Sequence, residues 1–305
     1  MSAVATAGVA ASVQRPLTAV MRDYLALTKP RIIVLLELTT LAPMIVIAHG
    51  WPGWRLVIMT MLGGWLASGG AGAVNCWFDR DIDAEMGRTR NRPVPAGRIR
   101  PAAALSFGLT LGALAFVVLA TTVNLLSALL AMTGFGFYTV IYTMLLKRTS
   151  SQNIVIGGAA GAIPPLVGCA AVSNSLGLTA LYMFAIVFYW TPPHFWALSL
   201  LLSRDYANAG VPMLPVVEGH RRTQTNILLY TVILTVVTML PFATRTFGVI
   251  YLIGTLALDA GFLIGATGVI RHRTARGARR LYYYSLLYLA LLFSVMALDS
   301  VLRLG

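Results

Sequence analysis

The sequence has little charge and almost no cysteine, and both scarcities narrow what it can encode. Only 11% of its 305 residues are charged, and only ten are acidic. The two cysteines, Cys76 and Cys169, stand alone in apolar stretches, which excludes a disulfide framework and a cysteine metal site. Apolar side chains are abundant instead: they make up 58% of the residues and give a mean hydropathy of +0.78. A soluble domain cannot bury so much apolar surface, so these values indicate an integral membrane protein.

Nine stretches are long and apolar enough to cross a bilayer, since one crossing needs about 20 such residues. Because a helix satisfies its own backbone hydrogen bonds in lipid, they predict an all-α, polytopic bundle forming one transmembrane domain over residues 25–305. Residues 1–24 are expected to be a flexible cytoplasmic tail and not a signal peptide, because no charged segment precedes an apolar core. The expected spans are roughly 32–49, 54–77, 102–121, 124–146, 154–173, 178–202, 226–243, 247–269 and 282–302.

The basic residues predict the orientation of this bundle. All of the 23 lysines and arginines except Arg55, Arg245 and Arg303 fall in the N-terminal tail or in the loops after the second, fourth, sixth and eighth spans. By the positive-inside rule that side is cytoplasmic, so we expect a multi-pass protein of the cell (inner) membrane with its N-terminus inside. The arginines of RHRTARGARR, after the eighth span, are explained equally well by contact with anionic membrane lipid. We expect no nucleic-acid partner.

Four of the ten acidic residues lie where the second span ends, in NCWFDRDIDAEMGRTRNRPVP (residues 75–95). If the helix continues beyond Phe78, then Asn75, Asp79 and Asp83 lie four residues apart and form one stripe. Carboxylates at this spacing repel each other unless a cation lies between them. Magnesium, which binds one or two carboxylates together with substrate phosphates, would make the stripe half of a diphosphate site. The alternative is that these carboxylates only neutralise the arginines of a solvated loop.

The residues around the stripe suit the same interpretation. Arg88, Arg90 and Arg92 follow it and would contact the remaining phosphate oxygens. Asp81 and Glu85 lie on another side of the helix, where arginines can pair with them. The preceding GGWLASGGAGAVN is rich in small residues, which let helices approach closely and leave room for a ligand.

The pattern N-x-x-x-D-x-x-x-D followed by R-x-R-x-R-P-x-P resembles the first aspartate-rich motif of the UbiA superfamily of intramembrane prenyltransferases. The stretches LTKPRI, YTMLLKRTSSQNIVIGGAAGAIPPLVG, PPHFWALSL and DYANAGVPMLPVV are similar to its heme-modifying branch, and the resemblance covers roughly residues 27–218. It implies nine transmembrane helices and a magnesium diphosphate site. It also implies transfer of a farnesyl group from farnesyl diphosphate to the vinyl group of heme b, giving heme O for heme-copper oxidase assembly. Heme b is then a substrate, and Mg²⁺ is the cofactor.

Together the motifs and the resemblance assign site residues in this chain. The catalytic set is Asp79, Asp83, Asp205 and Lys147. The implied metal ligands are Asn75, Asp79, Asp83 and Asp205, and the implied substrate-binding residues are Asn75, Arg88, Arg92, Tyr142, Arg148, His194 and Tyr206. In one departure, the second motif of the superfamily commonly has two aspartates four residues apart, whereas Asp205 has Leu201 and Ala209 at those positions. Asp205 would therefore bind magnesium alone on its side or hold Lys147 or Arg204 in place, and the sequence leaves both open.

His194 lies eleven residues before Asp205, which on a helix places it about 16 Å deeper in the membrane. An ionisable group at that depth is expected to face a cavity, as a heme-iron ligand, as a donor that orients the heme, or as a hydrogen-bonded structural residue. Pro192 and Pro193 are expected to break the local hydrogen-bond ladder beside it and to expose carbonyl oxygens, which is tolerated only where protein or a lined cavity satisfies them.

Two other functions remain open at this point. One is a prenyltransferase of an aromatic quinone precursor or chlorin. The other is a transporter, although the charges of a transporter should gather near the membrane midplane. If the product is heme O, this protein could also contact a downstream heme A synthase or oxidase.

Overall fold

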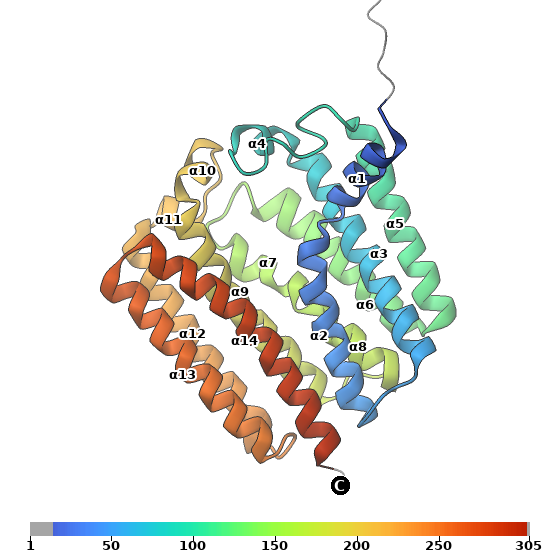
Figure 1. Ribbon diagram of the computed structural model, residues 1–305, viewed down its shortest axis with the longest axis vertical. Helices are drawn as coiled ribbons and strands as arrows, with labels where there is room; N and C mark the ends of the chain where they lie inside the picture. The colour runs from blue at the N-terminus through green and yellow to red at the C-terminus, as the bar shows by residue number, and fades with distance from the viewer. Residues whose placement is uncertain (1–14, 304–305) are drawn as a thin grey trace, which may run out of the picture.

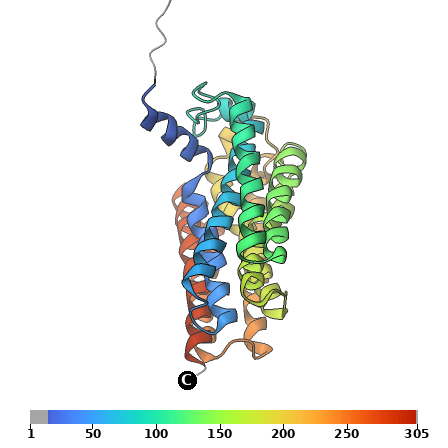
Figure 2. The same cartoon turned by 90° about the vertical axis from the view of Figure 1, so that its right-hand side faces the viewer.

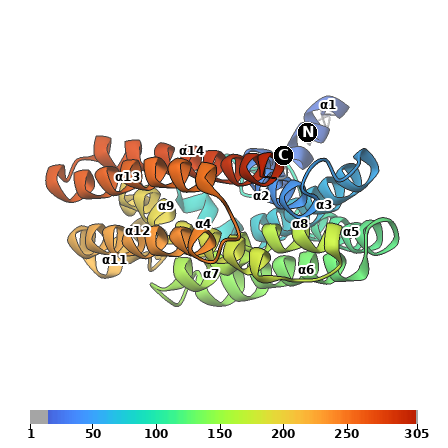
Figure 3. The same ribbon diagram turned by 90° about the horizontal axis from the view of Figure 1, so that it is seen from below.

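The computed structural model describes residues 15–303, and the regular elements in that part of the chain are all helices (Figure 1). Viewed from below, α13, α14, α2 and α3 lie along one side of the bundle, and α12, α7 and α6 lie along the other (Figure 3). The helices are α1 (Leu17–Leu27), α2 (Pro30–Ala48), α3 (Trp54–Phe78), α4 (Arg80–Glu85), α5 (Pro101–Thr122), α6 (Leu125–Gly136), the π-helix η1 (Phe137–Leu146), α7 (Asn153–Gly161), α8 (Ile163–Ser173), α9 (Leu178–Leu201), α10 (Ser203–Asn208), α11 (Leu214–Val217), α12 (Gly219–Ala243), α13 (Val249–His272) and α14 (Ala275–Leu302).

The predicted all-α membrane bundle is confirmed. Eight helical segments of the described chain are long and apolar enough to cross a membrane: α2, α3, α5, α6 with η1, α7 with α8, α12, α13 and α14. The expected span over residues 178–202 forms α9, which has 24 residues but contains a run of low hydropathy at Thr191, Pro192, Pro193 and His194. α9 packs against α12 and α14, so this less apolar helix is shielded by its neighbours.

The two prolines do not end the helix, because α9 runs without interruption from Leu178 to Leu201. Pro192 and Pro193 remove two backbone donors, yet both are buried between neighbouring helices that hold the segment helical. The hydroxyl of Thr191 also donates to the Val187 carbonyl oxygen at 2.8 Å.

Close contact between α3 and α5 depends on two glycines. A Cβ atom placed on Gly70 would lie 2.6 Å from the carbonyl oxygen of Gly108, and one placed on Gly108 would lie 2.8 Å from that of Gly70. Any larger residue would push the helices apart, so the prediction that the small residues of this stretch let helices approach closely is confirmed. This contact fixes the helix whose end carries the acidic cluster.

The tail expected over residues 1–24 is helical from Leu17 onward, and its residues 1–14 lie outside the described part of the chain. The buried Asp23 on α1 accepts a hydrogen bond from Arg98 Nε at 3.1 Å and pairs with Arg15. Burial opposes the charged form of Asp23, but these two arginines outweigh it and lower the pKa of the carboxyl. Because Arg98 is 75 residues from Asp23 in the sequence, this ion pair could not be predicted from the residues around α1 alone. α1 lies at the same end of the bundle as α4 and α10 (Figure 1).

Candidate active site

The acidic stripe forms where α3 passes into α4. Asp79 lies at the junction, and the helical hydrogen bonds continue through it, from Asp79 N to Asn75 O at 2.9 Å and from Asp83 N to Asp79 O at 2.8 Å. The Asn75 amide donates to Asp79 Oδ2 at 2.7 Å, so these side chains share one face as the spacing predicts. Asn75, Asp79 and Asp83 are only 3%, 0% and 1% exposed, which contradicts a merely solvated loop.

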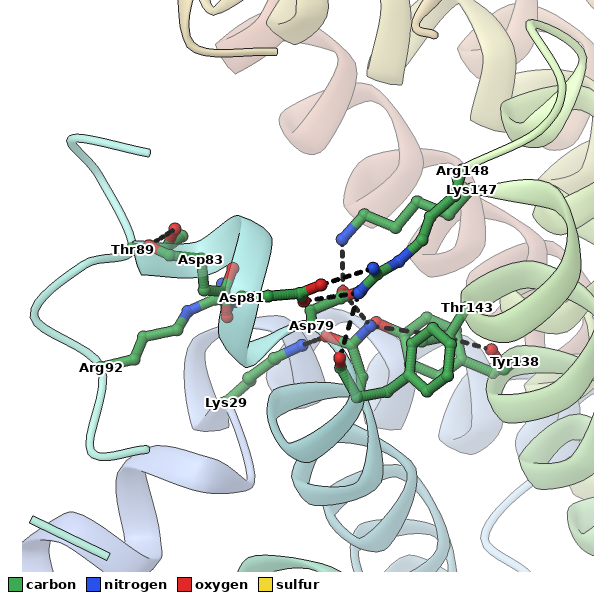
Figure 4. A network of polar contacts seen from close by, with 12 residues as sticks. Lys29, Asp79, Asp81, Asp83, Thr89, Arg92, Tyr138, Thr143, Lys147 and Arg148 are labelled. Atoms are coloured by element: carbon green, nitrogen blue, oxygen red, sulfur yellow. Dashed lines mark hydrogen bonds and ion pairs between the residues drawn. The ribbon is translucent and has the colours of Figure 1, made fainter. Parts of the chain in front are cut away.

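A π-helix brings the cations to this stripe. η1 ends with a bond from Lys147 N to the Tyr142 carbonyl oxygen, one residue further back than in an α-helix. Lys147 Nζ forms an ion pair with Asp79 Oδ2, and Arg148 lies 3.7 Å from Asp79 Oδ1. Within η1, Thr143 accepts a hydrogen bond from Asn75 Nδ2 at 3.0 Å. Figure 4 shows Lys147 and Arg148 reaching the carboxylates from the η1 side. The sequence did not predict this wider turn.

Two more cations approach from the opposite side (Figure 4). Arg92 Nη1 lies 2.6 Å from Asp83 Oδ2, and the Thr89 hydroxyl donates to the Asp83 carbonyl oxygen at 2.9 Å. Lys29, in the left-handed backbone region with φ of 57°, donates to Asn75 Oδ1. Sequence reasoning did not assign Lys29 a role, although it is the lysine of LTKPRI.

Asp81 pairs with Arg148 outside the buried stripe, as the sequence suggested for this carboxylate. Arg148 Nη1 and Nη2 each lie 2.7 Å from one oxygen of Asp81. This two-pronged hydrogen bond lowers the pKa of Asp81 to about 2. The Asp81 side chain is 60% exposed, so it holds Arg148 from the solvent side.

The residues around Asp79 fit a magnesium site that a phosphate completes. The described chain has no group of three or more His, Cys, Asp or Glu side chains that could hold a metal by itself. Asp79 Oδ1 is buried and makes no hydrogen bond within residues 15–303, and its ion-pair partner Arg148 lies 3.7 Å away, so the lone pairs of this oxygen are not committed to a hydrogen bond. Magnesium usually takes one or two carboxylates plus substrate phosphates and waters, which matches such an incomplete set.

The second motif lies close to the first. Asp205 Oδ1 is 4.0 Å from where a Cβ atom of Gly87 would be, beside Arg88 in the loop after α4. Lys147 pairs with Asp79 and not with Asp205. Magnesium binding and contact with Arg204 stay predictions for Asp205.

Tyr206 lies between the two motifs and is 4% exposed. Burial raises the pKa of its hydroxyl, with the charges of Arg88 and Arg92 opposing the shift and those of Asp205 and Asp79 adding to it.

Asn153 is a residue that sequence reasoning missed. It is fully buried at the start of α7, and neither its side-chain oxygen nor its nitrogen has a hydrogen-bond partner among the described residues. Gly157, four residues on and on the same face, abuts the ring of Tyr142: a Cβ atom there would lie 2.3 Å from Tyr142 Cδ2. Asn153 is therefore on the side of α7 that faces η1. Its signal in the sequence was an amide at a span end, within the stretch SSQNIVIGG.

His194 lies between two aromatic rings on α9 and α14. Its ring is stacked on Trp190 at 4.3 Å and on Tyr282 at 4.9 Å, and Nδ1 lies 2.7 Å from Ser285 Oγ. The Ser285 hydroxyl donates its hydrogen to the Tyr282 carbonyl oxygen at 2.7 Å. His194 Nδ1 must then be the donor to Ser285, so Nε2 carries the lone pair. Trp190 and Tyr282 cover the two faces of the His194 ring, so the edge that carries Nε2 is the part left for contact with a ligand.

Comparison with known sequences agrees with this geometry. The model of the UbiA prenyltransferase family matches residues 36–293. The chain is 54% identical over 282 residues to the protoheme IX farnesyltransferase of Symbiobacterium thermophilum, covering 92% of this chain and 94% of that protein. It is 52% identical over 300 residues to the protein of the same name from Chloroflexus aurantiacus, covering 98% of this chain but 51% of that protein. The chain thus spans about half the length of some relatives and nearly all of others.

Solved structures share the fold at low identity. A digeranylgeranylglyceryl phosphate synthase has a TM-score of 0.76 at 16% identity, covering 92% of this chain and 98% of that one. A UbiA homolog from Archaeoglobus fulgidus, solved with DMAPP and Mg²⁺, has a TM-score of 0.65 at 15% identity, covering 90% and 99%. The family model matches most of the chain, and the relatives are about half identical to it. The chain therefore belongs to the UbiA prenyltransferase family.

Proposed function

We propose that the protein transfers the farnesyl group of farnesyl diphosphate to the vinyl group of heme b, giving heme O and diphosphate. The observation that carries this proposal is the fully buried Asp79 carboxylate with Asn75 and Lys147 around it, at the end of an apolar helical bundle. A prenyl diphosphate matches this arrangement, because it joins a charged diphosphate head to an apolar prenyl tail. The relatives named protoheme IX farnesyltransferase, one matched over 94% of its length, support the heme acceptor.

The diphosphate would be held by the two motifs together. Asp79 and Asp83 are the principal candidates to hold Mg²⁺, with Asn75 and Asp205 as further oxygen ligands. Bound there, the metal would stabilise the negative charge that develops on the departing diphosphate. The Archaeoglobus fulgidus homolog was solved with DMAPP and Mg²⁺, which supports the same use of this fold here.

The cations around the stripe supply the remaining stabilisation. Lys147 and Arg148 on one side, and Arg88 and Arg92 on the other, would donate to diphosphate oxygens as the bond between C1 and oxygen breaks. This bond cleavage leaves an allylic cation. Tyr142, whose ring is stacked on Tyr138 with centroids 5.4 Å apart, is our candidate for an aromatic side chain that stabilises this cation.

The acceptor is proposed to lie beside His194. Its Nε2 lone pair, with the ring held by Trp190, Tyr282 and Ser285, has the form of a heme-iron ligand whose orientation is fixed by its other nitrogen. A vinyl carbon of the heme would bond to C1 of the farnesyl group. The resulting cation would take hydroxide from water and release a proton, which gives the hydroxyethylfarnesyl group of heme O.

The location follows from the basic loops. We place the site at the cytoplasmic face of the cell membrane, because the end of the bundle that carries α4 and α10 also carries the arginine-rich loops. Membrane lipid surrounds the bundle. Heme O released there would be available to a downstream heme A synthase or oxidase.

The test is to express the chain in cells that lack any homologue and to analyse the extracted hemes by mass spectrometry. A heme heavier than heme b by one hydroxyethylfarnesyl modification is expected. His194→Ala should reduce this product, whereas replacing His272, an exposed histidine at the end of α13, by alanine should not. If only heme b is found, and a supplied hydroxybenzoate or naphthoate is prenylated instead, the acceptor is a quinone precursor and the heme assignment is wrong.

A further inference from the structure

Helix α1 has one face packed against the bundle and an opposite, apolar face that is exposed. On the packed face Asp23 and Leu27 are 5% and 0% exposed, and Tyr24 contacts the edge of Phe107 with ring centroids 5.0 Å apart. On the opposite face, Leu17, Met21 and Leu25 are 73%, 63% and 51% exposed. Their four-residue spacing places them in one stripe. This stripe is large for a helix of 11 residues, and no described residue covers it.

The stripe leads directly into a surface that faces lipid. Only Thr28 and Lys29 separate α1 from α2, the first membrane span, whose opening turns expose Ile32 by 59% and Val34 by 65%. Figure 2 shows α1 leaning sideways, away from the bundle, at this end of α2. α1 therefore lies at the level where a span passes from acyl chains to headgroups.

The orientation of α1 about its own axis is fixed from inside. Arg98 donates to Asp23 Oδ1 at 3.1 Å and to the Asn91 carbonyl oxygen at 2.9 Å, and Arg15 adds a second ion pair to Asp23. Because these contacts hold the Asp23 face inward, the stripe must face outward.

We infer that α1 is an interfacial helix, with Leu17, Met21 and Leu25 immersed at the boundary between headgroups and acyl chains. An amphipathic helix with basic residues beside its apolar face binds a membrane surface in this way. The exposed Arg22 and Arg31 are placed to contact the phosphates of anionic lipid. This lipid contact does not depend on which prenyl acceptor the site uses.

The experiment uses the full-length protein in vesicles of phosphatidylcholine and phosphatidylglycerol. Single nitroxide labels are attached to Met21→Cys and Leu25→Cys, with Ala26→Cys as the matched control. Ala26 is exposed and lies about 140° round the helix from Met21. Cys76 and Cys169 are each 1% exposed and are replaced by alanine if they react. The measured quantity is collision with oxygen, which concentrates in lipid, relative to collision with a water-soluble nickel complex.

Labels at Met21 and Leu25 are expected to collide mainly with oxygen, and the label at Ala26 mainly with nickel. Equal nickel collision on both faces would show that α1 lies in water and would overturn the inference. Two further outcomes would also overturn it. If the label at Met21 becomes accessible to the nickel complex when residues 1–14 are deleted, the N-terminal segment covers the stripe and lipid does not. If the label becomes accessible to the nickel complex when the protein is diluted in lipid, a second copy of the protein covers the stripe.

Discussion

Replacing Asp79 by asparagine, alone and together with Lys147→Met, separates what the buried pair does for stability from what it does for catalysis. Asp79 is 0% exposed, and the side chain of Lys147 is 11% exposed. Removing one partner of such a pair leaves a buried charge without compensation, which typically costs about 3–5 kcal/mol, whereas replacing both partners is often nearly neutral. We therefore expect Asp79→Asn to lower the free energy of unfolding by about 3 kcal/mol. Adding Lys147→Met should restore at least half of this loss.

Turnover should behave differently, because neither change can be compensated in the reaction. Asp79→Asn removes the proposed metal anchor, and Lys147→Met removes a proposed diphosphate donor. Loss of one such electrostatic group typically lowers kcat by about 100-fold to 1,000-fold. The double variant should therefore be more stable than Asp79→Asn and yet equally inactive.

The assay is the thermal unfolding midpoint of the purified protein in detergent, combined with the rate of farnesyl transfer. Asp81→Asn is the matched control, since Asp81 lies two residues away in a surface ion pair worth about 1 kcal/mol or less. This control should lose much less activity than Asp79→Asn, because Arg148, which Asp81 holds from the solvent side, is also held near Asp79. An Asp79→Asn protein that transfers farnesyl at near the wild-type rate would refute the metal role. A double variant less stable than Asp79→Asn alone would refute the account of the buried pair.

Four further predictions concern the surrounding residues. Arg92→Ala should raise the KM for farnesyl diphosphate about tenfold, because a charge-assisted hydrogen bond is worth about 1.5–3 kcal/mol, while Arg276→Ala in the first turn of α14 should leave steady-state kinetics unchanged. Asn153→Leu should raise the thermal unfolding midpoint and lower kcat, because it removes two unpaired buried polar atoms from a place suited to ligand contact; a variant with unchanged kcat would mean that Asn153 is not used. Chelation by EDTA should abolish transfer and added Mg²⁺ should restore it, and transfer that persists after chelation would argue against a metal. Arg148 lowers the pKa of Asp81 to about 2, so the stabilisation from this pair should be constant above about pH 4 and be lost as pH falls towards 2. The check is the difference in thermal unfolding midpoint between wild type and Asp81→Asn, measured across that pH range.

The features that the sequence predicted correctly are those set by local spacing and hydropathy. Each span is a continuous apolar segment, so the bundle follows from composition along the chain. The stripe of Asn75, Asp79 and Asp83 depends only on helical periodicity, and their spacing of four residues survives the change from α3 to α4.

The features that it did not predict depend on contacts between distant segments. The sequence placed Lys147 near the site but left its partner open, and the choice of Asp79 depends on how η1 packs against α3 across 68 residues. Lys29 reaches Asn75 across 46 residues, and α1 is held by an arginine 75 residues away. The continuity of α9 through two prolines is likewise decided by its neighbours, because local propensity argues against it.

The π-helix at η1 constrains which insertions and deletions this span can accept. A span is usually free to gain or lose a residue at its ends, where the loop absorbs the change. The wider turns of η1 hold one more residue than an α-helix would hold between the same flanks, and loss of a residue from the α-helical part of this span would turn everything after it by about 100°. Lys147 and Arg148 would then leave Asp79, although no substituted side chain had touched the site. The length of this segment is therefore as much a requirement of the site as the identity of its charged residues, and alignments with α-helical relatives should place a one-residue gap inside a membrane span.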